Sequence, residues 1–249
     1  MKKIIFFIAV FLIIVMALVM LIKPVIIAYA KQKMEHAIPG STVSVGEINL
    51  NYSPWSLLQQ KATGDVLIKK FQREKFTAQN IKADLRWEGS HIFLDALSGQ
   101  VLNGTFDGKG SLTIGEQPQY SVQLNFTNLD LADFVRAFKL EDKVEMTGIL
   151  SGRVILNGKG KNVQILNGNL ASSAEGGNVT IQDTQFLENM ARSSKLPDNI
   201  VVDSFKDYHY NIGLVRMSLD QGDLVLDVAL DGARGKRNLK IDLHEFNLQ

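Results

Sequence analysis

An alternation of aliphatic and mostly polar side chains near the C-terminus constrains the fold more strongly than any other feature of this chain. Leu224, Leu226, Val228 and Leu230 alternate with Val225, Asp227, Ala229 and Asp231. Because successive side chains of a strand point to opposite faces, this pattern predicts a half-buried antiparallel strand with one apolar face. An apolar sheet face must pack against helices, a second sheet or an apolar ligand, so few architectures can accommodate it.

Two further runs of period two flank this strand. Tyr208, Tyr210, Ile212 and Leu214 precede it, and Leu239, Ile241 and Leu243 follow it. Gln221-Gly222 and the loop from Gly232 to Gly235 supply turn residues between the runs. Three meandering strands that share one apolar face are therefore predicted at this end of the chain.

Short extended segments recur through most of the preceding sequence. They begin with Val43, Val45, Ile48 and Leu50 and continue near Ala62 to Lys70, Phe76 to Trp87, His91 to Ala96, Val101 to Phe106, Gly110 to Ile114 and Tyr120 to Phe126. The expected turns are Asn103-Gly104, Asp107-Gly108, Asn157-Gly158 and Asn167-Gly168, because Asn, Asp and Gly tolerate positive φ. The sequence predicts a mainly β protein built on one long, curled antiparallel meander of about a dozen strands.

Three short helices are expected beside the strands. Asp130 to Lys139 has helical spacing of its apolar residues behind Asp130 as N-cap, and Thr184 to Lys195 has the same spacing before Pro197. Both are expected to cap the sheet, and the alternative is that they gate an apolar cavity. A third helix, Val25 to Ala37, is expected to end at Pro39-Gly40.

The segment from Ile4 to Ile22 is apolar throughout. Its about 19 residues would span roughly 28 Å as a helix, which matches the hydrocarbon core of a bilayer. A cleaved signal peptide is the alternative, since Ala28-Tyr29-Ala30 offers a small-x-small site, but the run is longer than a typical signal core and Lys23-Pro24 interrupts the approach to that site. The early pair Lys2 and Lys3 favours the N-terminus inside and the body outside, which in a bacterium means the inner membrane and the periplasm.

The charge balance argues against a nucleic-acid partner. Lys2, Lys3, Lys23, Lys31 and Lys33 are the only charged side chains before Glu35. Removing these five from the 27 basic residues leaves 22 against 26 acidic ones, so the remaining chain is slightly acidic. A protein that neutralises phosphates would keep a basic face.

Motifs of catalysis are absent from the sequence. The chain has no cysteine, and His36, His91, His209 and His244 show no metal-ligand spacing. Gly158 to Lys161 lacks the spacing of a phosphate-binding loop and is expected at a hairpin tip. No GxSxG elbow or paired carboxylates stand out, so we expect no enzyme activity, no cofactor and no metal. Trp55 and Trp87 could lie at a membrane interface or in a core.

Several motifs resemble the AsmA-like family of bacterial envelope proteins, which includes TamB and YdbH relatives. An apolar N-terminal segment and a helix are followed by Gly40 to Gly46, which resembles the family pattern G-x-x-V-x-V-G. Further resemblance lies in Gly108 to Leu112, Tyr120 to Leu131, Thr147 to Gly152 and Asn167 to Leu170. Phe205 to Tyr210, Gly222 to Leu226 and Leu230 to Gly232 are similar to the C-terminal domain of YdbH-type proteins, sometimes labelled a dicarboxylate-transport domain.

The resemblance implies a long sheet with an apolar trough, anchored in the inner membrane, that holds or conducts phospholipids. Residues 1–33 would be the anchor and exit helix, 34–172 an AsmA-like β domain, and 173–249 a YdbH-like segment that continues the sheet. Expected to line the groove are Val122, Leu124, Phe126, Leu224, Leu226, Val228, Leu230, Ile241 and Leu243. A chain of this length would need an envelope partner or self-assembly to bridge two membranes. The alternative function is a membrane-anchored scaffold or assembly factor that binds another envelope protein and carries no lipid.

Overall fold

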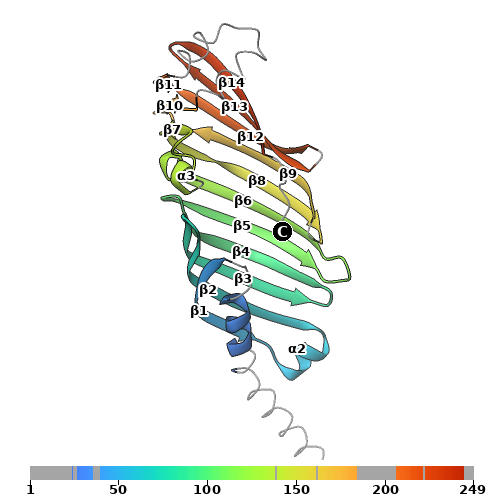
Figure 1. Ribbon diagram of the computed structural model, residues 1–249. Helices are drawn as coiled ribbons and strands as arrows, with labels where there is room; N and C mark the ends of the chain where they lie inside the picture. The colour runs from blue at the N-terminus through green and yellow to red at the C-terminus, as the bar shows by residue number, and fades with distance from the viewer. Residues whose placement is uncertain are drawn as a thin grey trace, which may run out of the picture.

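One antiparallel sheet of eleven strands forms the body of the protein (Figure 1). The computed structural model describes residues 24, 27–35, 40–137, 139–160, 162–183, 206–220 and 222–243. The strands of this sheet are β1 (Ser41–Asn51), β2 (Lys61–Arg73), β3 (Phe76–Glu88), β4 (His91–Val101), β5 (Gly104–Thr113), β6 (Gln119–Asp130), β8 (Ile149–Lys159), β9 (Asn162–Ser172), β12 (Ile212–Asp220), β13 (Asp223–Gly232) and β14 (Gly235–Leu243).

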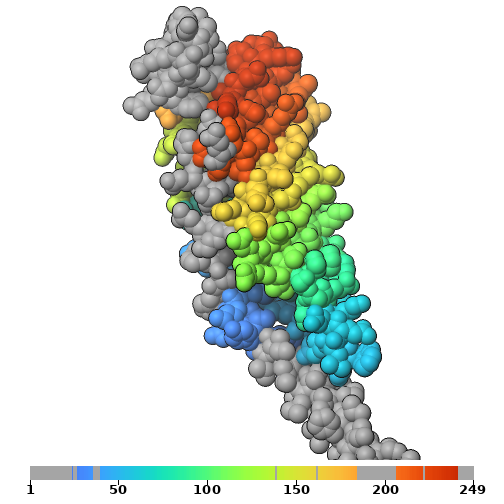
Figure 2. Space-filling view, turned by 90° about the vertical axis from the view of Figure 1, so that its right-hand side faces the viewer, coloured from blue at the N-terminus to red at the C-terminus, as the bar shows by residue number. Residues whose placement is uncertain are grey.

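The strands lie in the sheet in the order in which they follow one another along the chain. The order is β1-β2-β3-β4-β5-β6-β8-β9-β12-β13-β14, and every pairing is antiparallel. At about 4.8 Å between strands the sheet is roughly 48 Å from β1 to β14. Figure 2 shows the same succession from the blue end to the red end of an elongated molecule. The predicted long antiparallel meander is confirmed.

A second, three-stranded sheet packs against the first. It contains β7 (Val144–Met146), β10 (Gly177–Ile181) and β11 (Tyr208–Tyr210) in the order β11-β10-β7. Together with α3 (Leu131–Ala137) it lies along one side of the long sheet, at the left in Figure 1. We call the face of the long sheet that these elements contact the inner face and the opposite one the outer face.

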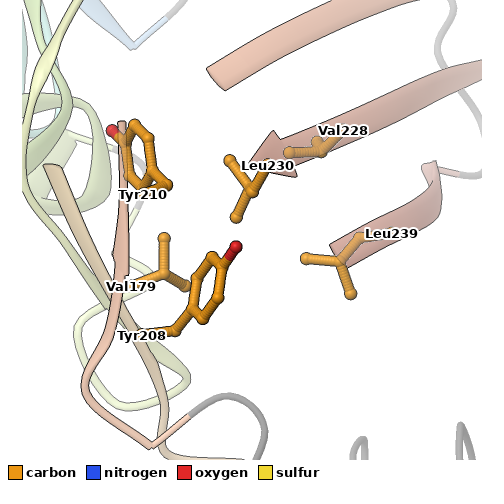
Figure 3. Close-up of a cluster of buried hydrophobic side chains, with 6 residues drawn as sticks. All are labelled: Val179, Tyr208, Tyr210, Val228, Leu230 and Leu239. Carbon is orange, nitrogen blue, oxygen red and sulfur yellow. The ribbon is translucent and has the colours of Figure 1, made fainter. Parts of the chain in front are cut away.

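The predicted run from Tyr208 to Leu214 is wrong as a single strand. The chain leaves the small sheet after Tyr210 and enters the long sheet at Ile212, and the two tyrosines are buried whereas Ile212 and Leu214 are exposed on the outer face. Figure 3 shows how Tyr208, Tyr210 and Val179 face three residues of the long sheet, Val228, Leu230 and Leu239. The face changes because β11 pairs with β10, a partner that is distant in the sequence.

The hairpin predictions around β4 and β5 need correction. A strand was expected from Val101 to Phe106, but Leu102 and Asn103 have φ of 49° and 56° and form the turn between β4 and β5. The expected turns Asp107-Gly108 and Asn167-Gly168 lie inside β5 and β9. Asn157-Gly158 marks a register shift within β8, two residues before the hairpin tip.

Gly108 explains why glycine marks a strand here instead of a turn. A Cβ at this position would lie 2.5 Å from the carbonyl oxygen of Gln123 and 2.8 Å from a methyl group of Leu124. Real Cβ atoms do not approach so closely, so β5 and β6 can adopt this spacing only with glycine at this position.

The helices agree with the predictions where the structure describes them. Asp130 accepts hydrogen bonds from the amides of Ala132 (2.7 Å) and Asp133 (3.2 Å), which caps α3 as expected. Residues 27–35 are helical. The predicted helix Thr184 to Lys195 and the predicted membrane span Ile4 to Ile22 lie outside the described residues. Among the residues that are described, no helix has the length and apolarity needed to cross a membrane.

One short helix was not predicted. It is α2 (Pro54–Leu58), which Ser53 caps by accepting from the Ser56 amide while the Ser56 hydroxyl accepts from the Ser53 amide. This reciprocal arrangement with Pro54 in the first turn stabilises a single helical turn between β1 and β2.

Candidate functional site

The inner face of the long sheet is apolar from one edge to the other. In an antiparallel pair, residues directly opposite one another point to the same face, so register pairs can be followed from strand to strand. We call the middle line of such pairs the central row; it contains Ile48, Val66, Ala83, Leu97, Gly108, Leu124, Val154, Gly168, Met217, Leu226 and Ile241. All of these positions are aliphatic, methionine or glycine, and none is charged.

A second apolar row lies beside the central row, on the side away from the small sheet. Register pairs connect Leu50, Gly64, Leu85, Leu94, Gly110, Val122, Leu156 and Leu166, and on the last three strands Leu219, Leu224 and Leu243. The apolar lining therefore covers several residues along each strand and extends across all eleven strands of the sheet.

The row on the other side of the central row is the one that the second layer covers. It contains Val45, Ile68 and Ile81 on β1 to β3, and Phe106, Phe126, Gly152, Leu170, Val215, Val228 and Leu239 from β5 to β14. Two buried clusters lie along this side, one around Tyr208 and Tyr210 and one around Leu131 of α3. This side of the inner face is the hydrophobic core of the protein.

Side chains of the central row are less buried than those beneath the small sheet, although Leu166 and Leu224 of the second apolar row are buried as well. Val228 and Leu239 are buried, whereas Leu226, Met217 and Leu124 are only half-buried. Half-buried aliphatic side chains that line a continuous face leave apolar surface that a bound apolar molecule could cover.

Seven of the nine predicted groove residues, all except Ile241 and Leu243, lie on the inner face of the long sheet. Val122, Leu124, Phe126 and Leu226 are half-buried, and Ile241 and Leu243 pair in register with Leu226 and Leu224. Leu224, Val228 and Leu230 are buried, and the latter two pack under the small sheet with Tyr208 and Tyr210. These two therefore belong to the protein's own core.

Most of the remaining inner-face residues were missed in the sequence. Val154 and Leu156 could not be found by period two, because Ile155 between them is also aliphatic. Leu94 and Leu97 could not be found either, because a register shift between them places two residues three positions apart on the same face.

The outer face is more polar than the inner one, although Ile165, Ile212 and Leu214 are exposed there. One row of register pairs there contains Asn125, Arg153, Asn169, Arg216, Asp227 and Lys240. Asn125 donates to Asp107 (2.8 Å) and accepts from Arg153 (3.1 Å), so neighbouring strands are linked by side-chain hydrogen bonds on this side. The sheet is amphipathic as a whole.

A bidentate ion pair also lies away from the apolar rows. The Arg86 guanidinium donates to both carboxylate oxygens of Asp95, at 2.8 and 2.9 Å, and stacks 4.3 Å from the Phe93 ring centroid. These hydrogen bonds lower the pKa of Asp95 and raise that of Arg86. Both groups are exposed, so the pair gives the surface a defined charge pattern and no reactive group.

A polar cleft of about 600 Å³ opens between α3 and the turn that joins β4 to β5. Its two cations are paired: Lys75 donates to Glu141 at 2.5 Å, and Arg136 pairs with Asp133. The Lys75 hydrogen bond lowers the pKa of Glu141. Gln79, Gln100 and Thr105 line the cleft and are register partners outside the apolar rows, so it is separate from the apolar lining.

The arrangement offers binding chemistry and little reaction chemistry. Across the described parts of the chain, no group of three or more His, Asp or Glu side chains could hold a metal ion. His91 and His209 contact Ser90 and Asn178 at the surface, and His36 and His244 lie outside the described residues. The inner face can hold apolar molecules by removing them from water.

Comparison with known proteins agrees with this geometry. The model of the YdbH-like family, described as the intermembrane phospholipid transport protein YdbH, matches residues 42–243. The match begins in β1 and ends in β14, so it covers the whole long sheet. No curated protein and no solved structure matches the chain.

Proposed function

The chain belongs to the YdbH-like family, and from that premise we propose that its inner face binds the acyl chains of phospholipids and guides them along the sheet. The observation that carries the proposal is the central row, in which all eleven strands contribute an uncharged apolar residue or a glycine. A molecule that moved along this row would stay against apolar surface from β1 to β14.

The binding energy would come from desolvation. Each methylene removed from water contributes about 0.8 kcal/mol, so an acyl chain can be held without a specific head-group site. Because neighbouring positions of the row are chemically similar, the free energy changes little as the chain shifts by one strand. At Gly108 and Gly168 the line has no side chain of its own, and the side chains of Leu124 and Met217 lie against these two glycines, so the apolar surface continues across them.

The anchor and the location are part of the same proposal. Ile4 to Ile22 would hold the protein in the bacterial inner membrane, with the sheet in the periplasm. The roughly 48 Å sheet would then carry lipid away from that membrane, and it would need an envelope partner or further copies to reach a second one.

Photo-crosslinking tests the proposal directly. A photoreactive amino acid is introduced at Leu124 or Leu226 of the full chain, and at Ile165 or Leu214, which are exposed on the outer face. Illumination in cells followed by mass spectrometry should give phospholipid adducts at the first two positions and not at the last two. Equal adducts on both faces, or none at Leu124 and Leu226, would refute lipid carriage. Protein adducts without lipid would favour the scaffold function instead.

A further inference from the structure

The helix α2 presents two large apolar side chains to solvent at the β1 end of the sheet. Trp55 is 70% exposed and Leu58 is 78% exposed, which makes them the most exposed large hydrophobic residues in the described part of the chain. They are three positions apart on one helical turn, so they lie on the same side of it. No charged residue occurs between Asn51 and Gln60.

This exposure belongs to a rigid element. Ser53 and Ser56 cap each other's amides at 3.0 and 2.8 Å, and the amides of Gln59 and Gln60 donate to the carbonyls of Trp55 and Leu57. The carbonyl of Gln60 in turn accepts from the Gly89 amide (2.9 Å) in the turn between β3 and β4. Two apolar side chains held outward on a fixed turn are costly in water and suit an apolar partner.

The helix at residues 27–35 lies at the same end of the molecule in Figures 1 and 2. Its Tyr29 is 62% exposed, with the Lys33 ammonium 5.6 Å from the ring centroid. Aromatic rings beside lysines are typical of the boundary between a bilayer and water, where the lysines meet anionic head groups.

Chain length ties this end to the apolar N-terminal segment. Four residues lie between Ile22 and residue 27, and the five steps from one Cα atom to the next span at most about 17 Å. If Ile4 to Ile22 crosses the bilayer, the β1 end must lie close to the membrane surface. Lys33 and the exposed pair Trp55 and Leu58 would then all lie near the membrane surface.

We propose that α2 inserts Trp55 and Leu58 into the interfacial region of the phospholipid bilayer and so seats the β1 end of the inner face on the membrane. The inference rests on the proposed function, because it gives acyl chains a path from the bilayer to Leu50 and Ile48 without crossing water. Trp55 supplies the amphipathic ring favoured at head-group depth, and Leu58 supplies the apolar depth.

Depth-dependent quenching of Trp55 fluorescence tests the insertion. The full chain carrying Trp87→Phe, in which Trp55 is the only tryptophan, is reconstituted into vesicles of phosphatidylethanolamine and phosphatidylglycerol with brominated phosphatidylcholine. Bromines near the head-group end of the acyl chains should quench more than about half of the emission, as expected for an interfacial ring. A control reporter, Ile212→Trp in a chain with both native tryptophans replaced by Phe, lies at the far end of the sheet and should not be quenched.

Unquenched Trp55 overturns the insertion, and emission that shifts with protein concentration instead would identify a second copy as the partner. Lipid crosslinks at Leu124 test the proposed function separately. Crosslinks that persist while Trp55 is unquenched would refute only the insertion, and a quenched Trp55 without crosslinks would refute only the lipid carriage. In the full chain, Trp55→Ser with Leu58→Ser should lower the Leu124 crosslink yield several-fold without lowering thermal stability. The matched pair Ile165→Ser with Leu214→Ser should leave that yield unchanged.

Discussion

Leu124 on β6 and Leu226 on β13 lie in the same cross-strand row of the inner face, joined through Val154, Gly168 and Met217. Side chains of directly opposed residues lie about 5 Å apart, so the row is one continuous apolar line. Strands from both halves of the chain contribute to it, because β9 pairs directly with β12. The functional division suggested after residue 172 therefore stays a prediction, while the sheet itself is continuous there.

A charge placed in this row should prevent lipid binding. Leu124→Asp or Leu226→Asp would expose acyl chains to a carboxylate whose desolvation is unfavourable, so phospholipid recovered with the purified protein should fall at least several-fold. Extraction and mass spectrometry of bound lipid measure the effect. Leu214→Asp, on the outer face, is the matched control and should retain wild-type lipid. Wild-type recovery from the folded Leu226→Asp protein would show that the central row does not hold lipid.

Val228 should respond differently from Leu226, although only one residue separates them. Val228 is buried against Tyr208 and Leu230, whereas Leu226 is half-buried. Val228→Asp should lower the free energy of unfolding by about 3 kcal/mol or more, because its carboxylate is buried without a partner. Leu226→Asp should cost clearly less in the same urea titration. Equal losses would mean that the central row is as much a closed core as the row beneath the small sheet.

The local part of the fold could be predicted from the sequence. The alternation from Leu224 to Leu230 and the capping of α3 by Asp130 are examples. Both can be predicted because each depends only on residues that are neighbours in the sequence. The face of the sheet to which the side chains of a strand point could not always be predicted. Tyr208, Tyr210, Ile212 and Leu214 continue the same alternation, yet the pairing of β11 with β10 puts the second pair on the outer face.

The inner face as a whole could not be predicted, because it depends on register between strands. Glycines illustrate the difficulty: Gly108 and Gly168 resemble turn residues in sequence but lie inside strands, and at Gly108 the close contact with β6 requires a glycine. Only the pairing of Gly108 with Leu124 and Leu97 reveals that it lies in the apolar row.

Two glycines of the inner face should differ in their tolerance of a methyl group. A Cβ at Gly152 would lie 2.0 Å from the carbonyl oxygen of Asn169, whereas at Gly168 its nearest neighbours are side-chain atoms of Met217, at 3.0 to 3.1 Å. The backbone cannot yield easily but methionine can, so Gly152→Ala should lower the free energy of unfolding by about 2 kcal/mol or more and Gly168→Ala by less than about 1 kcal/mol. Chemical denaturation of both variants measures the difference. The reverse order would contradict the β8–β9 spacing.

Stability at high pH should depend on Tyr210. Its hydroxyl donates to the Thr147 carbonyl at 2.9 Å, and burial raises its pKa from 10.0 to about 12. Between these values the unfolded chain loses the tyrosine proton while the folded protein keeps it, so rising pH favours unfolding. The stabilisation is complete below about pH 10 and is lost as the pH rises toward about 12.

The variant Tyr210→Phe isolates this effect. Near pH 7 it should cost about 1 kcal/mol for the lost hydrogen bond, and between pH 10 and 12 its free energy of unfolding should fall less steeply than that of the wild type. Urea titrations at several pH values measure both quantities. Tyr120→Phe leaves Tyr210 intact and should keep the wild-type slope. If Tyr210→Phe keeps the wild-type slope as well, deprotonation of Tyr210 does not cause the loss of stability at high pH.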